Sequence, residues 1–135
     1  MDMDLYITKH RVMQDYLRQL TNLVNGTIDK ANAPLIAELI NKTTGVLNMH
    51  LASEDHFVYP KLLESSDEKI RSITRSYMNE MTGIADSYLA FHKNFNTPSK
   101  ILADTDEFKK AFKQVRDALL MRIDREEKEL YTLTV

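Results

Sequence analysis

Apolar residues recur at alternating spacings of three and four along most of the chain, and this periodicity limits the fold more than any other feature. The spacing places apolar side chains on one face of an α-helix. Only 3 Gly and 3 Pro interrupt it. The pattern predicts an all-α protein with helices over residues 4–24, 33–63, 67–96 and 104–132. We expect Pro60 to kink or end the second helix nearby. Short connections between long helices favour an antiparallel up-down-up-down four-helix bundle.

Length and composition narrow the possible functions. At 135 residues the chain is most simply one domain, 1–135. It has no cysteine, so any metal must be held by His, Asp, Glu, Tyr or Met. The net charge of −2, with both signs interspersed, argues against nucleic acid as a partner. The sequence lacks a long apolar run and a signal-like N-terminus, so we expect a cytoplasmic protein that does not bind a membrane. Nothing in it indicates an enzyme.

The two halves of the chain resemble each other. The stretch "LNMHLASEDHFVY" at 47–59 aligns with "LLMRIDREEKELY" at 119–131, an offset of 72, and the first helix aligns with the third at an offset of 71. The offsets pair His50 with Arg122, Glu54 with Glu126, Tyr59 with Tyr131, and His10 with Met81. We interpret the chain as two diverged helical hairpins related by a pseudo-twofold axis.

Ionisable residues interrupt the apolar stripes at one level of the predicted bundle. Counting residues to each turn, at about 1.5 Å per residue, places four residues in one layer, with Glu54 and Glu126 one turn further along. These four are His10, His50, Met81 and Arg122. A single buried histidine is usually a hydrogen-bonded core residue. Several buried ionisable groups in one layer are costly unless they are paired or bound to a metal. We expect His56, His92 and the run "DREEKE", apart from Glu126, to lie outside the site.

The layer has the composition of a metal site. Two imidazoles and two carboxylates suit Fe(II) and also admit Mn or Zn. The predicted metal ligands are His10, His50, Glu54 and Glu126. A competing chemistry uses the same carboxylates, because the permanently charged guanidinium of Arg122 could form a bidentate salt bridge between Glu54 and Glu126.

At these residues the chain resembles the hemerythrin-like, or HHE cation-binding, family over essentially its whole length. The motifs are an early His10, then H-L-x-x-E-D-x-x-V-Y-P from His50, then x-I-x-x-E-E-x-x-L-Y around Glu126. The resemblance implies a bundle with a non-haem di-iron centre that binds or senses oxygen, or that handles iron or responds to nitric oxide. Met81 and Arg122 stand where the family has histidine. We therefore expect an incomplete site with one iron per chain, two or none being the alternatives, and O2 or NO as the ligand.

A second resemblance gives a different function. The stretch "ALLMRIDREEKEL" at 118–130 is similar to the last helix of bacterial anti-sigma-factor regulators, which carries an arginine followed by acids. This resemblance covers one helix and implies a metal-free bundle that binds a protein partner through its surface.

Overall fold

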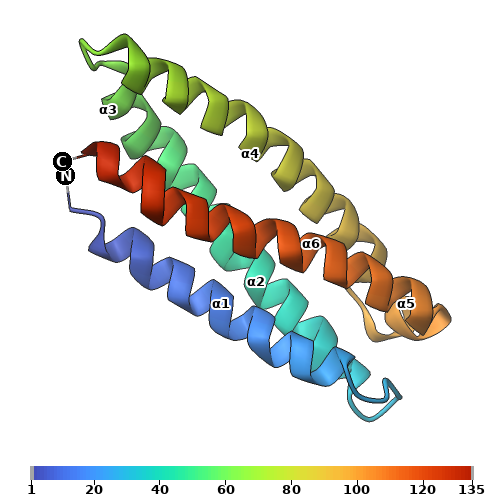
Figure 1. Ribbon diagram of the computed structural model, residues 1–135. Helices are drawn as coiled ribbons and strands as arrows, with labels where there is room; N and C mark the ends of the chain where they lie inside the picture. Colours follow the sequence, from blue (N-terminus) through green and yellow to red (C-terminus); the bar gives the residue numbers. More distant parts are fainter. Residues whose placement is uncertain (1, 135) are drawn as a thin grey trace.

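The computed structural model describes residues 2–134, which form an antiparallel bundle of four long helical runs (Figure 1). The first is α1 (Asp4–Val24). The second consists of α2 (Ala33–Ser53), the π-helix η1 (Glu54–Val58) and α3 (Tyr59–Leu63). The third is α4 (Glu68–Phe95), and the fourth consists of α6 (Thr105–Arg125), the π-helix η2 (Glu126–Leu130) and the 3₁₀ turn η3 (Tyr131–Thr134). The runs alternate in direction and both chain ends lie at one end of the bundle, which confirms the predicted fold class.

Side-chain caps explain where several helices begin. Asp67 accepts a hydrogen bond from the backbone N–H of Lys69 at the start of α4, and Asp104 accepts one from Glu107 at the start of α6. The connection before α6 contains a short helix, α5 (Pro98–Ala103), that the sequence did not predict. Its Ile101 is fully buried, so this turn is held against the core rather than extended across the surface.

The second helical run continues three residues beyond Pro60 and ends at Leu63, as expected. The irregular part of this run is the π-helix η1 just before the proline. An equivalent π-helix, η2, lies 72 residues later, where Thr132 occupies the position of Pro60. The two π turns are therefore a shared feature of the two halves, and proline is not their cause.

Tyrosine hydroxyls support both π turns in the same way. A π turn changes the backbone pairing from i+4 to i+5, so carbonyls at its edge need other donors. The Tyr6 hydroxyl donates to the carbonyl of Ser53, at 3.4 Å, directly before η1. The Tyr77 hydroxyl donates to the carbonyl of Arg125, at 3.2 Å, directly before η2. Both pairs obey the sequence offsets, so the pseudo-twofold extends to single hydrogen bonds.

The apolar core has two parts. The larger cluster includes Leu17, Ile40, Phe91, Phe108 and Phe112, and it fills the end of the bundle away from the chain ends. The smaller consists of Met3, Val58, Tyr59, Leu62, Tyr77, Leu130 and Tyr131. A fully buried side chain of this kind contributes about 1.5–3 kcal/mol. Between the two clusters lies a buried polar layer that needs its own explanation: His10, His50, Glu54, Arg122 and Glu126.

Within residues 2–134, no helix is both long enough and apolar enough to cross a membrane.

Candidate metal centre

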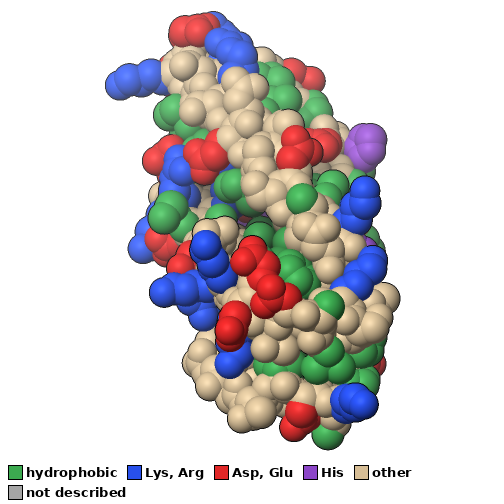
Figure 2. Space-filling model, turned by 90° about the vertical axis from the view of Figure 1, so that its right-hand side faces the viewer, with side chains coloured by type: hydrophobic (Ala, Val, Ile, Leu, Met, Phe, Trp, Pro, Cys, Tyr) green, Lys and Arg blue, Asp and Glu red, His purple; other side chains and the backbone are tan. Residues whose placement is uncertain are grey.

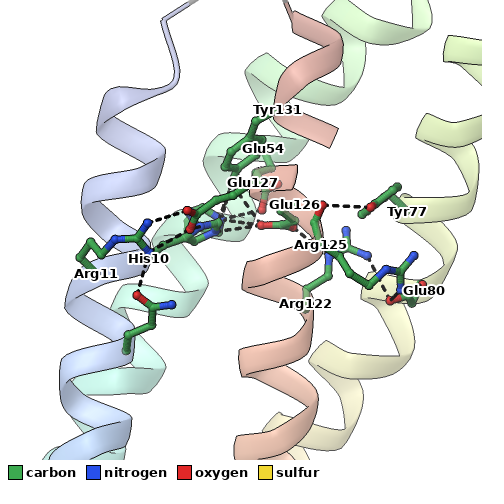
Figure 3. A network of polar contacts seen from close by, with 12 residues as sticks. His10, Arg11, Glu54, Tyr77, Glu80, Arg122, Arg125, Glu126, Glu127 and Tyr131 are labelled. Atoms are coloured by element: carbon green, nitrogen blue, oxygen red, sulfur yellow. Dashed lines mark hydrogen bonds and ion pairs between the residues drawn. The ribbon is translucent and has the colours of Figure 1, made fainter. Parts of the chain in front are cut away.

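Four donor atoms from three helical runs converge in the polar layer (Figure 3). They are Nε2 of His10 on α1, Nε2 of His50 on α2, Oε1 of Glu126 on η2 and the phenolic oxygen of Tyr131 on η3. Nε2 of His10 lies 3.1 Å from Nε2 of His50 and 2.9 Å from Oε1 of Glu126, and the latter two atoms are 3.4 Å apart. The Tyr131 oxygen lies 3.2, 3.2 and 3.1 Å from the same three atoms. All four side chains are buried.

Hydrogen bonds alone cannot explain six such short contacts. An ionised carboxylate carries no proton, and each imidazole nitrogen or phenol oxygen carries at most one. Burial would raise the pKa of Glu126, but hydrogen bonds from His10 and His50 and the charge of Arg122 hold it well below its usual range. At most three protons are thus available for the six contacts. The remaining contacts bring like groups together at about 3 Å, either two lone pairs or two protonated donors, which is unfavourable unless a metal cation takes the place of the protons.

The same distances fit a metal ion. The centre of a regular tetrahedron lies about 0.61 edge lengths from each corner, so edges of 2.9–3.4 Å place a central point about 1.8–2.1 Å from each atom. Bonds from zinc to nitrogen and oxygen donors are about 2.0–2.2 Å. Imidazole and oxygen donors suit iron, manganese or zinc. Ligand atoms of His10, His50 and Glu126 also lie within 4.8 Å of one another, as a shared metal requires.

His10 is oriented by a neighbouring ion pair. Its Nδ1 lies 2.8 Å from Oε2 of Glu127, and the guanidinium of Arg11 binds both oxygens of that carboxylate, at 3.0 and 2.6 Å (Figure 3). Burial would raise the pKa of Glu127, but hydrogen bonds from Arg11 and His10 lower it. A proton on Nδ1, donated to Glu127, leaves the lone pair of Nε2 facing the centre. The sequence-based expectation that Glu127 is plain helix surface was wrong, because this face of η2 packs against α1.

Tyr131 is a site residue that the sequence analysis missed. In an α-helix, a residue five positions after Glu126 would point about 140° away from it. The π turn η2 changes this angle and brings the Tyr131 hydroxyl to 3.1 Å from the Glu126 carboxylate. The signal in the sequence was the repeat itself, because tyrosine follows glutamate by five positions in both halves, at Tyr59 and Tyr131.

Glu54 lies beside the four atoms as a fully buried carboxylate. Its Oε1 is 2.8 Å from Nε2 of His50, but the contact is not aligned as a hydrogen bond, and neither oxygen has a hydrogen-bond partner within residues 2–134. Burial raises the pKa of Glu54 to about 7, and the charge of Glu126 acts in the same direction. Burial would lower the pKa of His50, but Glu126 and Glu54 raise it to about 9. Without a metal, His50 and part of the Glu54 population therefore keep their protons at neutral pH.

Arg122 fills the equivalent position in the other half. Its Nε donates to Oε2 of Glu126 at 2.9 Å, and its Nη2 donates to the Tyr59 hydroxyl at 3.1 Å. The guanidinium carbon lies 4.4 Å from the centre of the Tyr77 ring. The guanidinium does not bridge Glu54 and Glu126, the alternative that the sequence left open: its Nε and Nη2 bind Glu126 and Tyr59, and its Nη1 lies 3.6 Å from Oε1 of Glu80. Arg122 with Tyr59 thus mirrors His50 with Tyr131.

The structure brings together the four residues of the expected layer and the two glutamates one turn further along. His10, His50, Glu54, Met81, Arg122 and Glu126 all line one internal cavity of about 10 Å³. His56 is exposed, and His92 binds Oδ1 of Asn41 at 2.7 Å near the far end of α4, so neither reaches the centre. Arg122 and Glu126, which carried the second resemblance, are buried in the bundle.

The comparison with protein families agrees with this geometry. The family model for the hemerythrin HHE cation-binding domain matches residues 2–134, which include both halves of the bundle and every residue of the candidate centre. No curated protein and no solved structure matches the chain significantly.

Proposed function

Because the chain belongs to the hemerythrin HHE cation-binding domain family, we propose that it binds one non-haem iron ion per chain as a binding or sensing protein rather than an enzyme. The ligands are Nε2 of His10, Nε2 of His50, Oε1 of Glu126 and the oxygen of Tyr131, with Glu54 beside them. One observation carries the proposal: these four buried donor atoms make six contacts that too few protons can fill. Bound iron would supply a coordination position for a small ligand such as O2 or NO.

The protein's own side chains prepare the centre for this role. Glu127 and Arg11 orient His10, as described above. Apolar side chains line the cavity beside the ionisable ones: Met13, Leu47, Leu51, Met81, Leu119 and Ile123. The cavity has a volume of about 10 Å³, so it admits one small molecule at a time, and a ligand would have to displace any water in it.

Arg122 limits the number of metal ions. At an effective dielectric near 20, a unit charge about 4 Å from a divalent ion opposes it by roughly 8 kcal/mol before relaxation and screening. The guanidinium is buried, permanently charged and bonded to Oε2 of Glu126. An oxygen that would otherwise bind a second ion is therefore already occupied.

Metal analysis of protein purified from iron-supplemented cells, with an absorption spectrum in air, tests the proposal. We expect up to one iron per chain in the wild type, none in His50→Ala and the wild-type content in His92→Ala. His92 is the matched control, because it is a histidine outside the centre. Two irons with an oxo-bridge band would reject the single-ion site, and equal metal content in both variants would reject the ligand assignment.

A further inference from the structure

The internal cavity lies on the open side of the donor set. His10, His50 and Glu126 line it, whereas Tyr131 does not, so the cavity lies across from the phenol. Its volume is about 10 Å³, roughly the space that one water molecule needs. A small ligand must enter this space to reach the three ligand side chains.

A pocket on the surface lies next to this cavity. It lies between the second helical run and α4 and has a volume of about 210 Å³, and its lining includes Leu51, Asp55, Met81, Thr82, Ala85 and Asp86. Leu51 and Met81 line both the pocket and the cavity, so these two side chains form the wall between them. Methionine is unbranched and turns about three bonds, which makes Met81 the more mobile part of the wall.

The pseudo-twofold explains why this pocket is open beside Met81. Thr82, Ala85 and Asp55 correspond to Arg11, Gln14 and Glu127 in the other half. Hydrogen bonds join those three side chains: Arg11 donates to Gln14 at 2.7 Å and to Glu127 at 3.0 and 2.6 Å. Figure 3 shows this group beside His10. Short side chains at the equivalent positions leave the space next to Met81 open.

A second pocket approaches the centre less directly. It lies between α1 and α2, has a volume of about 160 Å³, and is lined by Leu5, Tyr6, Lys9, Met49, His50 and Ser53. Of its six lining residues, only His50 also lines the cavity, and the Nε2 of this ring is itself a donor atom. A molecule in this pocket therefore meets the back of a metal ligand and not the open side.

We propose that a neutral diatomic molecule reaches the centre through the pocket between the second helical run and α4, and that Met81 moves aside to admit it. The inference rests on the proposed function. It assigns a role to Met81, which stands opposite His10 in the second half of the chain. The exposed carboxylates of Asp55 and Asp86 flank the pocket, so an anion is disfavoured relative to a neutral molecule.

The first test measures the association rate of NO with Fe(II)-loaded protein. Ala85→Trp fills the pocket and should slow association roughly tenfold, because binding then needs a larger rearrangement. Met81→Ala should speed it. Met49→Trp is the matched control: Met49 is 68% exposed at the other pocket, and its substitution should leave the rate unchanged. Iron content and thermal unfolding confirm that each variant is loaded and folded.

The second test needs no metal. Dissolved O2 is paramagnetic and speeds the relaxation of methyl protons that it reaches. Met13 lines the cavity but not the surface pocket, so its methyl group reports arrival inside. In metal-free protein we expect Ala85→Trp to remove most of this effect and Met49→Trp to preserve it.

The two tests separate failure of the proposed function from failure of the route. If the wild type takes up no iron or no NO, the proposed function fails, and the metal-free measurement still decides the route. The route is overturned if Ala85→Trp leaves the O2 effect on Met13 unchanged, or if the wild type shows no such effect.

Discussion

Tyr131 and Tyr59 occupy equivalent positions but have different partners. The Tyr131 hydroxyl meets His10, His50 and Glu126, whereas the Tyr59 hydroxyl accepts a hydrogen bond from Arg122. Burial raises the pKa of both phenols above the ordinary value, with the Glu126 and Glu54 carboxylates adding to the effect on Tyr131. In the metal-free protein both side chains therefore keep their protons, and only a bound cation could displace the proton of Tyr131.

Substitution of these tyrosines distinguishes their roles. Ferric protein should show a visible charge-transfer band from the Tyr131 phenolate, and Tyr131→Phe should abolish this band because phenylalanine offers no oxygen. Tyr59→Phe should retain the band, since Tyr59 contacts Arg122 instead of the donor set. Absorption spectra of the three proteins, matched for iron content, provide the measurement. Identical spectra for the two variants would show that Tyr131 is not a ligand.

Glu127 acts on the centre only through His10. Glu127→Gln should weaken metal binding by about 10–100-fold, because partners that orient a ligating histidine typically contribute that much. Competition with a chelator of known affinity measures the change. Asp55→Asn is the control, since Asp55 is the equivalent acid in the other half and is exposed. Equal affinities for the two variants would contradict the orienting role of Glu127.

The regular parts of the helices were predictable, and the π turns were not. The apolar periodicity placed the first helix at residues 4–24 and the second helical run at 33–63, as observed. Periodicity assumes 3.6 residues per turn throughout, so it cannot show an i+5 turn. Tyr131 and Glu127 were missed for related reasons: the first depends on η2, and the second depends on which face of η2 meets α1.

The equivalence of the two hairpins allows the second half-site to be rebuilt. Met81→His with Arg122→His would place imidazoles opposite His10 and His50 and would remove the fixed charge next to Glu126. We expect iron content to rise toward two per chain, with a bridged di-iron spectrum, and Arg122→His alone to achieve part of this. Elemental analysis and absorption spectra test the expectation. A folded double variant with wild-type iron content would contradict it.

The polar layer makes the stability of the whole molecule depend on pH. The pKa of His50, about 9 in the fold, lies above its ordinary 6.5, so the folded protein keeps a proton that the unfolded chain releases. This contribution is fully present below pH 6.5 and is lost as the pH rises through 9. The pKa of Glu54 is raised from 4.5 to about 7, so its proton also stabilises the fold, and this contribution is lost as the pH rises from 4.5 through 7.

Urea unfolding of the metal-free protein should therefore show a stability loss of about 3 kcal/mol between pH 6.5 and 9. Metal-loaded protein should show a smaller loss or a gain, because ligands bind the ion in their deprotonated forms. The metal-free His50→Gln variant, which cannot titrate at this position, should lose most of the dependence. The same slope in that variant would assign the effect to other groups.

The donor set ties together only part of the bundle. Its atoms come from α1, α2 and the last helical run, while α4 contributes Met81 to the cavity wall and none of the four donors. A bound ion would therefore link α1, α2 and the last helical run, whereas α4 is held by core packing and by polar contacts outside the donor set, such as those of Tyr77 and Glu80 with Arg125. Amide hydrogen exchange should slow on metal binding in α1, α2 and the last helical run, and change least in α4. The helix that borders the pocket beside Met81 is α4, so it would remain the helix that opens locally most easily.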